Sequence, residues 1–172
     1  MKRLVTAALL AAGTALAVSA APAVPAAAAA SGNETFTGTL VFTAVPGTNT
    51  RTVISSVVVA KGAFRGVGRF VELSQPLGLD DLVFPSGTLH IVGTLGDLSF
   101  SVDPHSCLFS GTQQLTWDVT GGTGQFGGAS GSVTGTVSGR ALLARNPDGT
   151  CSFTQQPRHE VDKFAESGSL SF

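Results

Sequence analysis

An alternation of apolar and polar residues runs through most of this chain and restricts it to strands that bury one face of a sheet. The segment 36–44 shows the pattern most clearly. One of its faces carries Phe36, Gly38, Leu40, Phe42 and Ala44. Threonines dominate the other face, where Val41 is the exception. We therefore predict an all-β fold.

Turn residues divide the alternating pattern into short strands. The segments with strand character are 36–44, 52–60, 63–73, 82–84, 88–94, 98–102, 108–119, 132–144, 152–153, 160–165 and 169–172. Between them, Gly96-Asp97 is expected to form a turn and residues 74–81 a loop. A short helix over 160–166 is the alternative to a strand there.

Around eight or nine short strands at regular spacing indicate a β-sandwich or a closed barrel. Glycines at alternate strand positions, such as Gly66 and Gly68 or Gly135 and Gly139, permit sharp coiling and close packing. This pattern favours an antiparallel β-barrel of about eight strands. Trp117 and the eleven phenylalanines are expected to form its core.

The N-terminal segment 1–30 has the parts of a secretory signal peptide: a basic start, an apolar run over 4–18 and an alanine tract interrupted by prolines. Cleavage is expected near Ala28 or Ala30, which leaves residues 31–172 as a single secreted domain. A structural N-terminal helix is the alternative, which the prolines disfavour. The apolar run is too short for a transmembrane helix, so no stable membrane insertion is expected.

The charge balance disfavours two classes of partner. The chain has ten Lys and Arg against eleven Asp and Glu. Without Lys2 and Arg3, the secreted domain keeps eight basic residues against the same eleven acids. Nucleic acids and anionic membranes bind clustered basic surfaces. Neither is therefore expected as a partner.

Cys107 and Cys151 are the two cysteines, and both lie in the predicted secreted domain. In an oxidising compartment, two such cysteines form a disulfide by default. Closing a loop of about 45 residues stabilises a fold by roughly 3–4 kcal/mol through the entropy of the unfolded chain. A metal site or a catalytic thiol is disfavoured because neither cysteine lies in a Cys-x-x-Cys pattern.

Residues 122–127 match the dinucleotide-binding fingerprint G-x-G-x-x-G. That fingerprint needs a helix that begins at the loop, whose N-terminus meets the pyrophosphate. Residues 128–134 have turn and strand chemistry instead, so no cofactor is expected. We expect a tight structural turn that uses positive φ or close backbone approach, formed by Gly121, Gly122 and Gly124. Phe126 can then fold inward and plug one end of the barrel.

Two groups of polar residues contain side chains that can ligate metals. His159, Glu160 and Asp162 form one group, and Asp103 with His105 forms the other. Neither group has a recognised ligand spacing such as H-E-x-x-H. Exposed polar clusters, and no metal, are therefore expected.

Other polar residues could act as acids, bases or anion-binding groups. Asp80 and Asp81 could work as paired carboxylates, but adjacent residues diverge in direction, which favours solvated loop charges. His90 points away from its apolar strand neighbours, toward solvent or into a lumen, where it could act as an acid or base. Arg65 and Arg69 share a strand face and could bind an anion, although exposed edge charges are commoner. No Gly-x-Ser-x-Gly nucleophile is present, so no catalytic residue is identified.

The segment from Trp117 through Thr120-Gly121-Gly122-Thr123-Gly124 to Gly131 resembles a signature of the allene oxide cyclase-like barrel group, which includes the plant dirigent proteins. Members of that group carry a strand ending in Thr-Gly-Gly-Thr/Ser-Gly, then an aromatic or aliphatic residue, a small turn and another strand. The run 82–89 and the two cysteines are similar to those of small secreted actinobacterial proteins of that barrel type.

The resemblance implies an eight-stranded antiparallel barrel with a central cavity. In the cyclases that cavity converts an unstable fatty-acid epoxide. In the dirigent proteins it steers the coupling of phenoxy radicals supplied by another enzyme. The acidic pocket residues of the dirigent group find no match in the N-terminal half of this chain, which also has no tyrosine.

Three functions remain open as hypotheses. The first is a secreted, non-catalytic barrel that binds a small, mostly apolar ligand or assists another secreted component. The apolar composition and the missing catalytic set favour it. The second is an enzyme or coupling guide of the cyclase or dirigent type, an isomerase if it follows the cyclases. The third is a structural or surface-interaction protein whose barrel is filled by phenylalanines.

Overall fold

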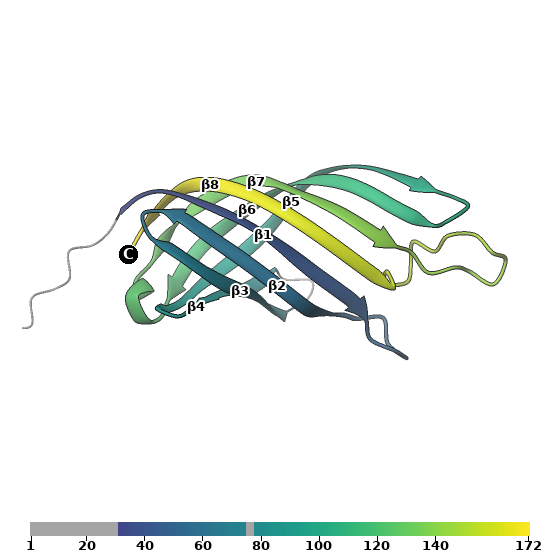
Figure 1. Ribbon diagram of the computed structural model, residues 1–172, viewed down its shortest axis with the longest axis horizontal. Helices are drawn as coiled ribbons and strands as arrows, with labels where there is room; N and C mark the ends of the chain where they lie inside the picture. Colours follow the sequence, from purple (N-terminus) through teal and green to yellow (C-terminus); the bar gives the residue numbers. More distant parts are fainter. Residues whose placement is uncertain (1–30, 75–77) are drawn as a thin grey trace, which may run out of the picture.

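The computed structural model describes residues 31–74 and 78–172, which form a closed barrel of eight antiparallel strands. The strands follow one another round the barrel in chain order, and the last pairs with the first (Figure 1). Their bounds are β1 Ser31–Ala44, β2 Arg51–Gly62, β3 Arg65–Ser74, β4 Leu79–Phe84, β5 Gly87–Asp103, β6 Leu108–Gly122, β7 Ser130–Leu142 and β8 His159–Ser171. The predicted all-β barrel is confirmed. The predicted signal peptide, 1–30, lies outside the described residues.

Helical structure is minimal in the described part of the chain. The 3-10 turn η1, Gly124–Phe126, lies between β6 and β7. Within residues 31–74 and 78–172, no helix is long and apolar enough to cross a membrane.

Alternation along each strand turns every second side chain toward the lumen. In β1, the inward residues Phe36, Leu40 and Phe42 are buried, as the spacing predicts. The other strands contribute in the same way to a single core. Its buried members are Phe36, Leu40, Phe42, Val58, Ala60, Phe64, Phe70, Leu82, Phe84, Leu89, Ile91, Trp117, Val119, Phe126, Ala129, Val133, Phe164 and Leu170.

One end of the barrel lies beside η1 and the C-terminus (Figure 1). Aromatic side chains fill this end. Phe126 is fully buried there. Its ring centroid lies 4.7 Å from that of Phe64, 5.9 Å from that of Phe84 and 5.3 Å from that of Phe172. Edge-on contacts of this kind add to the stabilisation from apolar burial. This end of the lumen is therefore closed.

The turn between β6 and η1 brings Phe126 into the barrel. Gly121 has a φ of 153° and Gly124 a φ of 62°, both in the region that favours glycine. A Cβ on Gly122 would lie 2.5 Å from the carbonyl oxygen of Thr88. The backbone path therefore requires residues without side chains. Because η1 leads into β7 rather than into a helix, the fingerprint at 122–127 does not form a dinucleotide site.

Cys107 and Cys151 form the predicted disulfide, with their Cα atoms 5.4 Å apart. Cys107 lies in the turn between β5 and β6, and Cys151 lies in the connection between β7 and β8. The β5–β6 hairpin extends past the other strands (Figure 1). Ala141 and Leu143 pack with Cys107 in a small second hydrophobic cluster. The disulfide therefore ties the connection between β7 and β8 to the β5–β6 hairpin.

Several predicted segment boundaries are wrong. Segments 88–94 and 98–102 are one strand, β5, because Gly96-Asp97 lies at a bulge in the pairing with β6 rather than in a turn. Segments 160–165 and 169–172 likewise form the single strand β8, so the helix alternative at 160–166 is also wrong. The stretch 152–153 follows an isolated bridge and belongs to no strand.

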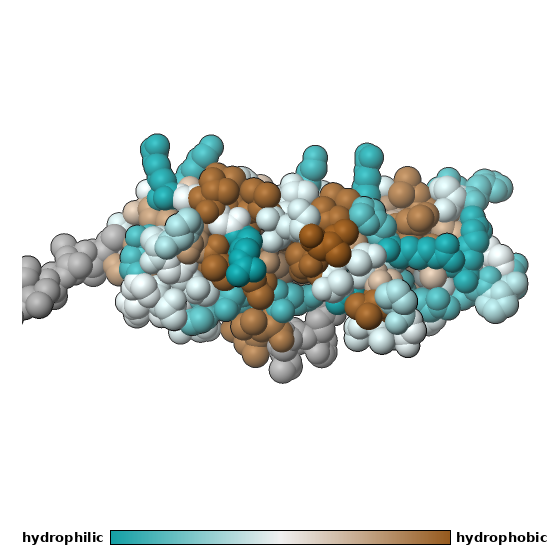
Figure 2. Space-filling view, turned by 60° about the horizontal axis from the view of Figure 1, so that its bottom comes forward, coloured by the Kyte–Doolittle hydropathy of each residue, from teal (hydrophilic) through white to brown (hydrophobic). Residues whose placement is uncertain are grey.

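Three phenylalanines lie outside the barrel core, contrary to the prediction: Phe109, which packs against the second cluster, and two exposed ones. Phe100 and Phe153 are 54% and 67% exposed. Both belong to the extension beyond the barrel, which has no lumen to fill. Apolar side chains also gather in patches between polar ones on the face seen in Figure 2. Val57 of β2 and Val67 of β3 are among the exposed apolar residues of the outer surface.

Candidate functional site

A cavity of about 490 Å³ occupies the end of the lumen opposite η1, and we call it the mouth cavity. Its wall is mostly apolar and consists of Leu40, Phe42, Phe70, Leu95, Leu115, Trp117 and Val137. Its charged lining residues are Arg51, Glu72, Asp80 and Asp162. Gly78, Gly93 and Thr94 complete the lining. Inward alternation on all eight strands therefore places four ionisable groups, from β2, β3, β4 and β8, against an apolar wall.

Arg51, at the start of β2, is held by two carboxylates. Its Nη1 lies 2.7 Å from Oε2 of Glu160, and its Nη2 lies 3.6 Å from Oε1 of Glu72. The guanidinium also lies over the ring of Phe42, 4.1 Å from the centroid. Contacts with β1, β3 and β8 therefore fix this cation in the lumen.

Asp80 lies on β4 in phase with the buried Leu82, and only 9% of it is exposed. Its Oδ1 is buried and has no hydrogen-bond partner. The pKa of Asp80 is raised to about 7, mainly by burial and also by the negative charge of Glu72. A backbone hydrogen bond from Leu73 and the charge of Arg51 act in the opposite direction. Desolvation is the dominant cause.

Asp162 lies on β8 and has a similarly raised pKa of about 7. Burial is the main cause, the negative charge of Glu160 adds to it, and Arg51 opposes it. A Cβ on Gly139 of the neighbouring β7 would lie 2.5 Å from Oδ1 of Asp162, so this glycine makes room for the carboxyl group. Near neutral pH, Asp80 and Asp162 can each donate a proton, accept one or balance a cation.

Two further carboxyl groups lie in the lumen but do not line the mouth cavity. Glu34 is fully buried and accepts hydrogen bonds from the backbone N–H groups of Phe64, at 3.0 Å, and Thr35, at 3.2 Å. Its role is to fix the turn between β2 and β3. Glu166 is 2% exposed, and neither of its carboxyl oxygens has a partner. Burial raises the pKa of Glu166 to about 8.

The residues singled out from the sequence do not converge on one site. Asp81 points outward from β4, and its Oδ1 lies 2.7 Å from Nδ1 of His90, so His90 does not enter the lumen. Asp103 accepts hydrogen bonds within the β5–β6 hairpin. Arg65 and Arg69 are exposed on the outer face of β3. Among residues 31–74 and 78–172, no group of three His, Cys, Asp or Glu side chains could hold a metal ion.

Two predictions about carboxylates are wrong. Asp80 is not a solvated loop residue, because β4 begins at Leu79 and turns it inward. Glu160 and Asp162 are not part of an exposed cluster, although the adjacent His159 is exposed. Strand alternation could have identified these residues as inward-facing. Each lies an even number of positions from a buried apolar residue of its own strand, and such residues share one face.

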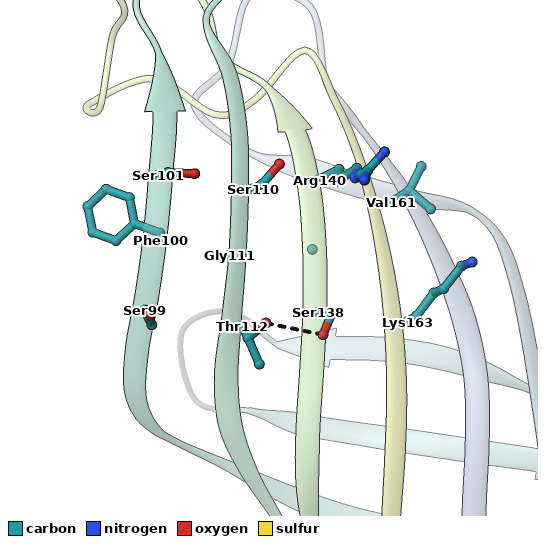
Figure 3. Close-up of a pocket in the computed structure, with 11 residues that line it drawn as sticks. Ser99, Phe100, Ser101, Ser110, Gly111, Thr112, Ser138, Arg140, Val161 and Lys163 are labelled. Atoms are coloured by element: carbon teal, nitrogen blue, oxygen red, sulfur yellow. Dashed lines mark hydrogen bonds between the residues drawn. The ribbon is translucent and has the colours of Figure 1, made fainter.

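A second hollow, of about 870 Å³, lies on the outer face of β5 to β8 (Figure 3). Cross-strand pairing aligns hydroxyl groups in it, and the hydroxyls of Thr112 and Ser138 lie 3.3 Å apart. Arg140 and Lys163 project from the two neighbouring strands, β7 and β8 (Figure 3). These four side chains are all exposed. The mouth cavity is therefore the stronger candidate, because it encloses buried ionisable groups.

Searches of protein-family models, curated proteins and solved structures find no match to this chain. The functional argument therefore rests on the geometry of the mouth cavity. That cavity combines an apolar wall, one fixed guanidinium and two carboxyl groups whose pKa values lie near neutrality.

Proposed function

We propose that this protein binds one small, mostly apolar molecule in the mouth cavity. The observation that supports this function is the unfilled volume of about 490 Å³, which has an apolar wall and a few polar groups. Small-molecule sites usually combine an apolar wall with a few polar groups that orient the ligand. An eight-stranded barrel is just wide enough to hold one such ligand. An unfilled mouth is also a reason to prefer binding over a purely structural role.

We propose further that binding takes place outside the cell. The disulfide between Cys107 and Cys151 is compatible with an oxidising compartment. The predicted signal peptide at 1–30 points the same way.

Trp117 offers a direct test because it is the one tryptophan of the chain and lines the mouth cavity. We expect its fluorescence to change, with saturation, when residues 31–172 are titrated with the neutral probe phenylbutanol. Gly93→Leu should weaken binding by at least about tenfold, since the new side chain would occupy the cavity. A Cβ on Gly93 would lie 3.5 Å from the nearest Trp117 atom, so the strand has room for the first atom of a side chain there.

The matched control is Thr134→Leu, which adds a similar side chain on the exposed outer face of β7. Its affinity for phenylbutanol should equal that of the unsubstituted protein. Equal weakening in both variants, or no saturable signal in any of the three proteins, would contradict binding in the mouth cavity.

A second candidate is a cyclase- or dirigent-type protein that steers a reactive intermediate in the same cavity. The observation that favours it is the raised pKa, about 7, of both Asp80 and Asp162, which makes each a possible proton donor near neutrality. Phenoxy radicals can be generated from a propenylphenol by a separate oxidase, and the coupled products separated by chiral chromatography. An excess of one enantiomer that Asp80→Asn removes would support this function. Racemic products with the folded protein present would exclude it for phenol coupling.

A further inference from the structure

We infer that the ligand of the mouth cavity is a cation, an ammonium group on an apolar body, with Asp80 as its counter-ion. This inference rests on the proposed binding function and specifies the chemical class of the ligand. It follows from the balance of charges in the cavity and from the one carboxyl oxygen there that is buried without a partner.

The charged groups at the mouth cavity come from four strands. Arg51 of β2, Glu72 of β3, Asp80 of β4 and Asp162 of β8 line it, and Glu160 of β8 lies beside it, paired with Arg51. The described lining residues of β1, β5, β6 and β7 carry no charge. Four carboxyl groups therefore meet a single guanidinium.

Arg51 does not balance all four carboxyl groups. Its two Nη atoms are directed at Glu160 and Glu72, at 2.7 and 3.6 Å. Asp80 is the cross-strand partner of Glu72, and Asp162 lies two positions from Glu160 on the same face of β8. Each side of Arg51 therefore has one carboxyl group paired with the guanidinium and one left over.

Asp80 is the better counter-ion of the two that are left over. It is about nine-tenths buried, it lines the cavity, and its buried Oδ1 accepts no hydrogen bond. An ammonium group donates up to three hydrogen bonds and would supply both the missing donor and the missing charge. The ring faces of Phe70 and Trp117, which also line the cavity, could stabilise a cation by their quadrupoles.

An anionic ligand fits the cavity poorly. Arg51 is the one cation in its described lining. Two carboxylates engage its Nη atoms and the ring of Phe42 lies against its guanidinium, which leaves its buried Nε without a partner. A carboxylate ligand would therefore enter a site with an excess of negative charge. A neutral ligand would meet no such repulsion, but it would also leave an ionised Asp80 without a counter-charge.

Cation binding should be linked to the release of a proton. The raised pKa of Asp80 means that its carboxyl group is largely protonated in mildly acidic solution. A bound ammonium favours the ionised form, so Asp80 must release its proton. The affinity for an amine should therefore fall by up to about tenfold for each unit of pH below neutrality. The affinity for an uncharged ligand of the same shape should not fall in this way.

The test compares three probes that share one apolar body: phenylbutylamine, phenylbutanol and phenylbutyrate. Binding to residues 31–172 is followed by Trp117 fluorescence in mildly acidic and mildly alkaline buffers of equal ionic strength. In alkaline buffer we expect phenylbutylamine to bind at least about tenfold more tightly than phenylbutanol. Phenylbutyrate should bind most weakly. Only the amine should lose affinity as the pH falls.

Asp80→Asn is the variant that tests the counter-ion. It should remove the preference for the amine and its pH dependence, so that phenylbutylamine and phenylbutanol bind this variant with similar affinity. Asp81→Asn is the matched control, since the same change is made one residue away, on the outer face of β4. It should leave all three affinities unchanged. Asp162→Asn provides a second variant, with a smaller expected loss of amine affinity, should Asp80→Asn fail to fold.

The outcomes separate this inference from the proposed function. Amine and alcohol binding equally tightly at all pH values would overturn the cation inference and leave small-molecule binding standing. So would an amine preference that survives in Asp80→Asn. The failure of all three probes to bind the folded protein would overturn both. A phenylbutyrate affinity above that of the amine would show that Arg51, not Asp80, selects the ligand.

Discussion

Replacement of Glu166 by glutamine should stabilise the protein at neutral and alkaline pH. The Glu166 carboxyl group is 2% exposed and has no hydrogen-bond partner on either oxygen. Its burial raises its pKa from 4.5 to about 8. The folded state therefore holds a proton on Glu166 in a pH range where the unfolded chain has lost it. Glutamine has a similar shape to the neutral acid but no charge to desolvate.

The magnitude follows from the difference between the folded and unfolded pKa values of Glu166. A folded-state pKa of about 8 against 4.5 is a difference of about 3.5, and each pKa unit corresponds to about 1.4 kcal/mol. Because the folded-state pKa is raised, the unfavourable contribution of Glu166 to the free energy of folding is smallest when the pH is below the unfolded-state pKa. It then becomes more unfavourable as the pH rises toward the folded value. The penalty is about 3 kcal/mol at neutral pH and approaches about 5 kcal/mol above the folded pKa.

Urea denaturation of residues 31–172 and of Glu166→Gln, with the disulfide intact, measures this difference across a pH series. Other carboxyl groups titrate in both proteins, so their effects largely cancel in the comparison. Near the unfolded pKa the two free energies of unfolding should differ little, apart from the pH-independent effect of the amide. The advantage of Glu166→Gln should then grow steadily with pH. A difference that stays constant between mildly acidic and mildly alkaline pH would show that water or a hydrogen-bond donor reaches Glu166, and would refute the reasoning.

Three further predictions concern the frame of the barrel. Replacing both Cys107 and Cys151 by alanine should lower the free energy of unfolding by about 4 kcal/mol, because the disulfide closes a loop with a sequence separation of 44. Urea denaturation measures this loss, and an unchanged midpoint would contradict the prediction. Gly38→Ala should destabilise by more than about 2 kcal/mol, because a Cβ there would collide with the Val57 carbonyl oxygen and the Phe164 ring. Gly127→Ala, where the nearest atom to a Cβ lies 3.5 Å away, should stay within about 0.5 kcal/mol in the same assay; similar effects of the two substitutions would argue against the close β1–β2 approach. Phe126→Ala should lower the free energy of unfolding by about 3–5 kcal/mol, because it opens a cavity in the aromatic end of the barrel. A loss below about 1 kcal/mol in urea denaturation would show that Phe126 contributes little to stability.

The fold was predictable because period-two alternation and turn residues act locally. The phase of Phe36, Leu40 and Phe42 specifies the buried face of β1 without reference to any other strand. The bulge at Gly96-Asp97 was not predictable in this way, since a Gly-Asp pair also suits a turn. The chain forms a bulge there because β5 pairs with β6 on both sides of Gly96-Asp97. That pairing joins residues far apart in the sequence, so the local sequence does not show it.

The charged residues of the lumen were missed because their charge was taken to indicate exposure, although the alternation along their strands places them on the inward face. In β8, counting in steps of two from the buried Phe164 reaches Asp162 and Glu160 in one direction and Glu166 in the other. All of these carboxyl groups therefore share the buried face. They were predicted to be exposed because most Asp and Glu residues in proteins lie on the surface. The partner that holds Glu160, Arg51, is far away in sequence and could not be assigned before the barrel was closed.

The two ends of the lumen differ in a way that separates stability from binding. Aromatic rings fill the end around Phe126, whereas the mouth cavity is left open beside Trp117. Gly93→Leu should therefore raise stability while it weakens phenylbutanol binding. A Cβ at Gly93 would make ordinary contacts, 3.5 and 3.6 Å from two Trp117 atoms, and the rest of a leucine side chain would bury apolar area in the cavity. We expect a gain of about 1–2 kcal/mol in the free energy of unfolding, from this burial and from the reduced flexibility of the unfolded chain. A variant that loses both stability and binding would show that Gly93 is needed for the fold itself. A variant that gains stability while binding falls would show that the empty mouth is kept at the expense of stability, which is the signature of a ligand site.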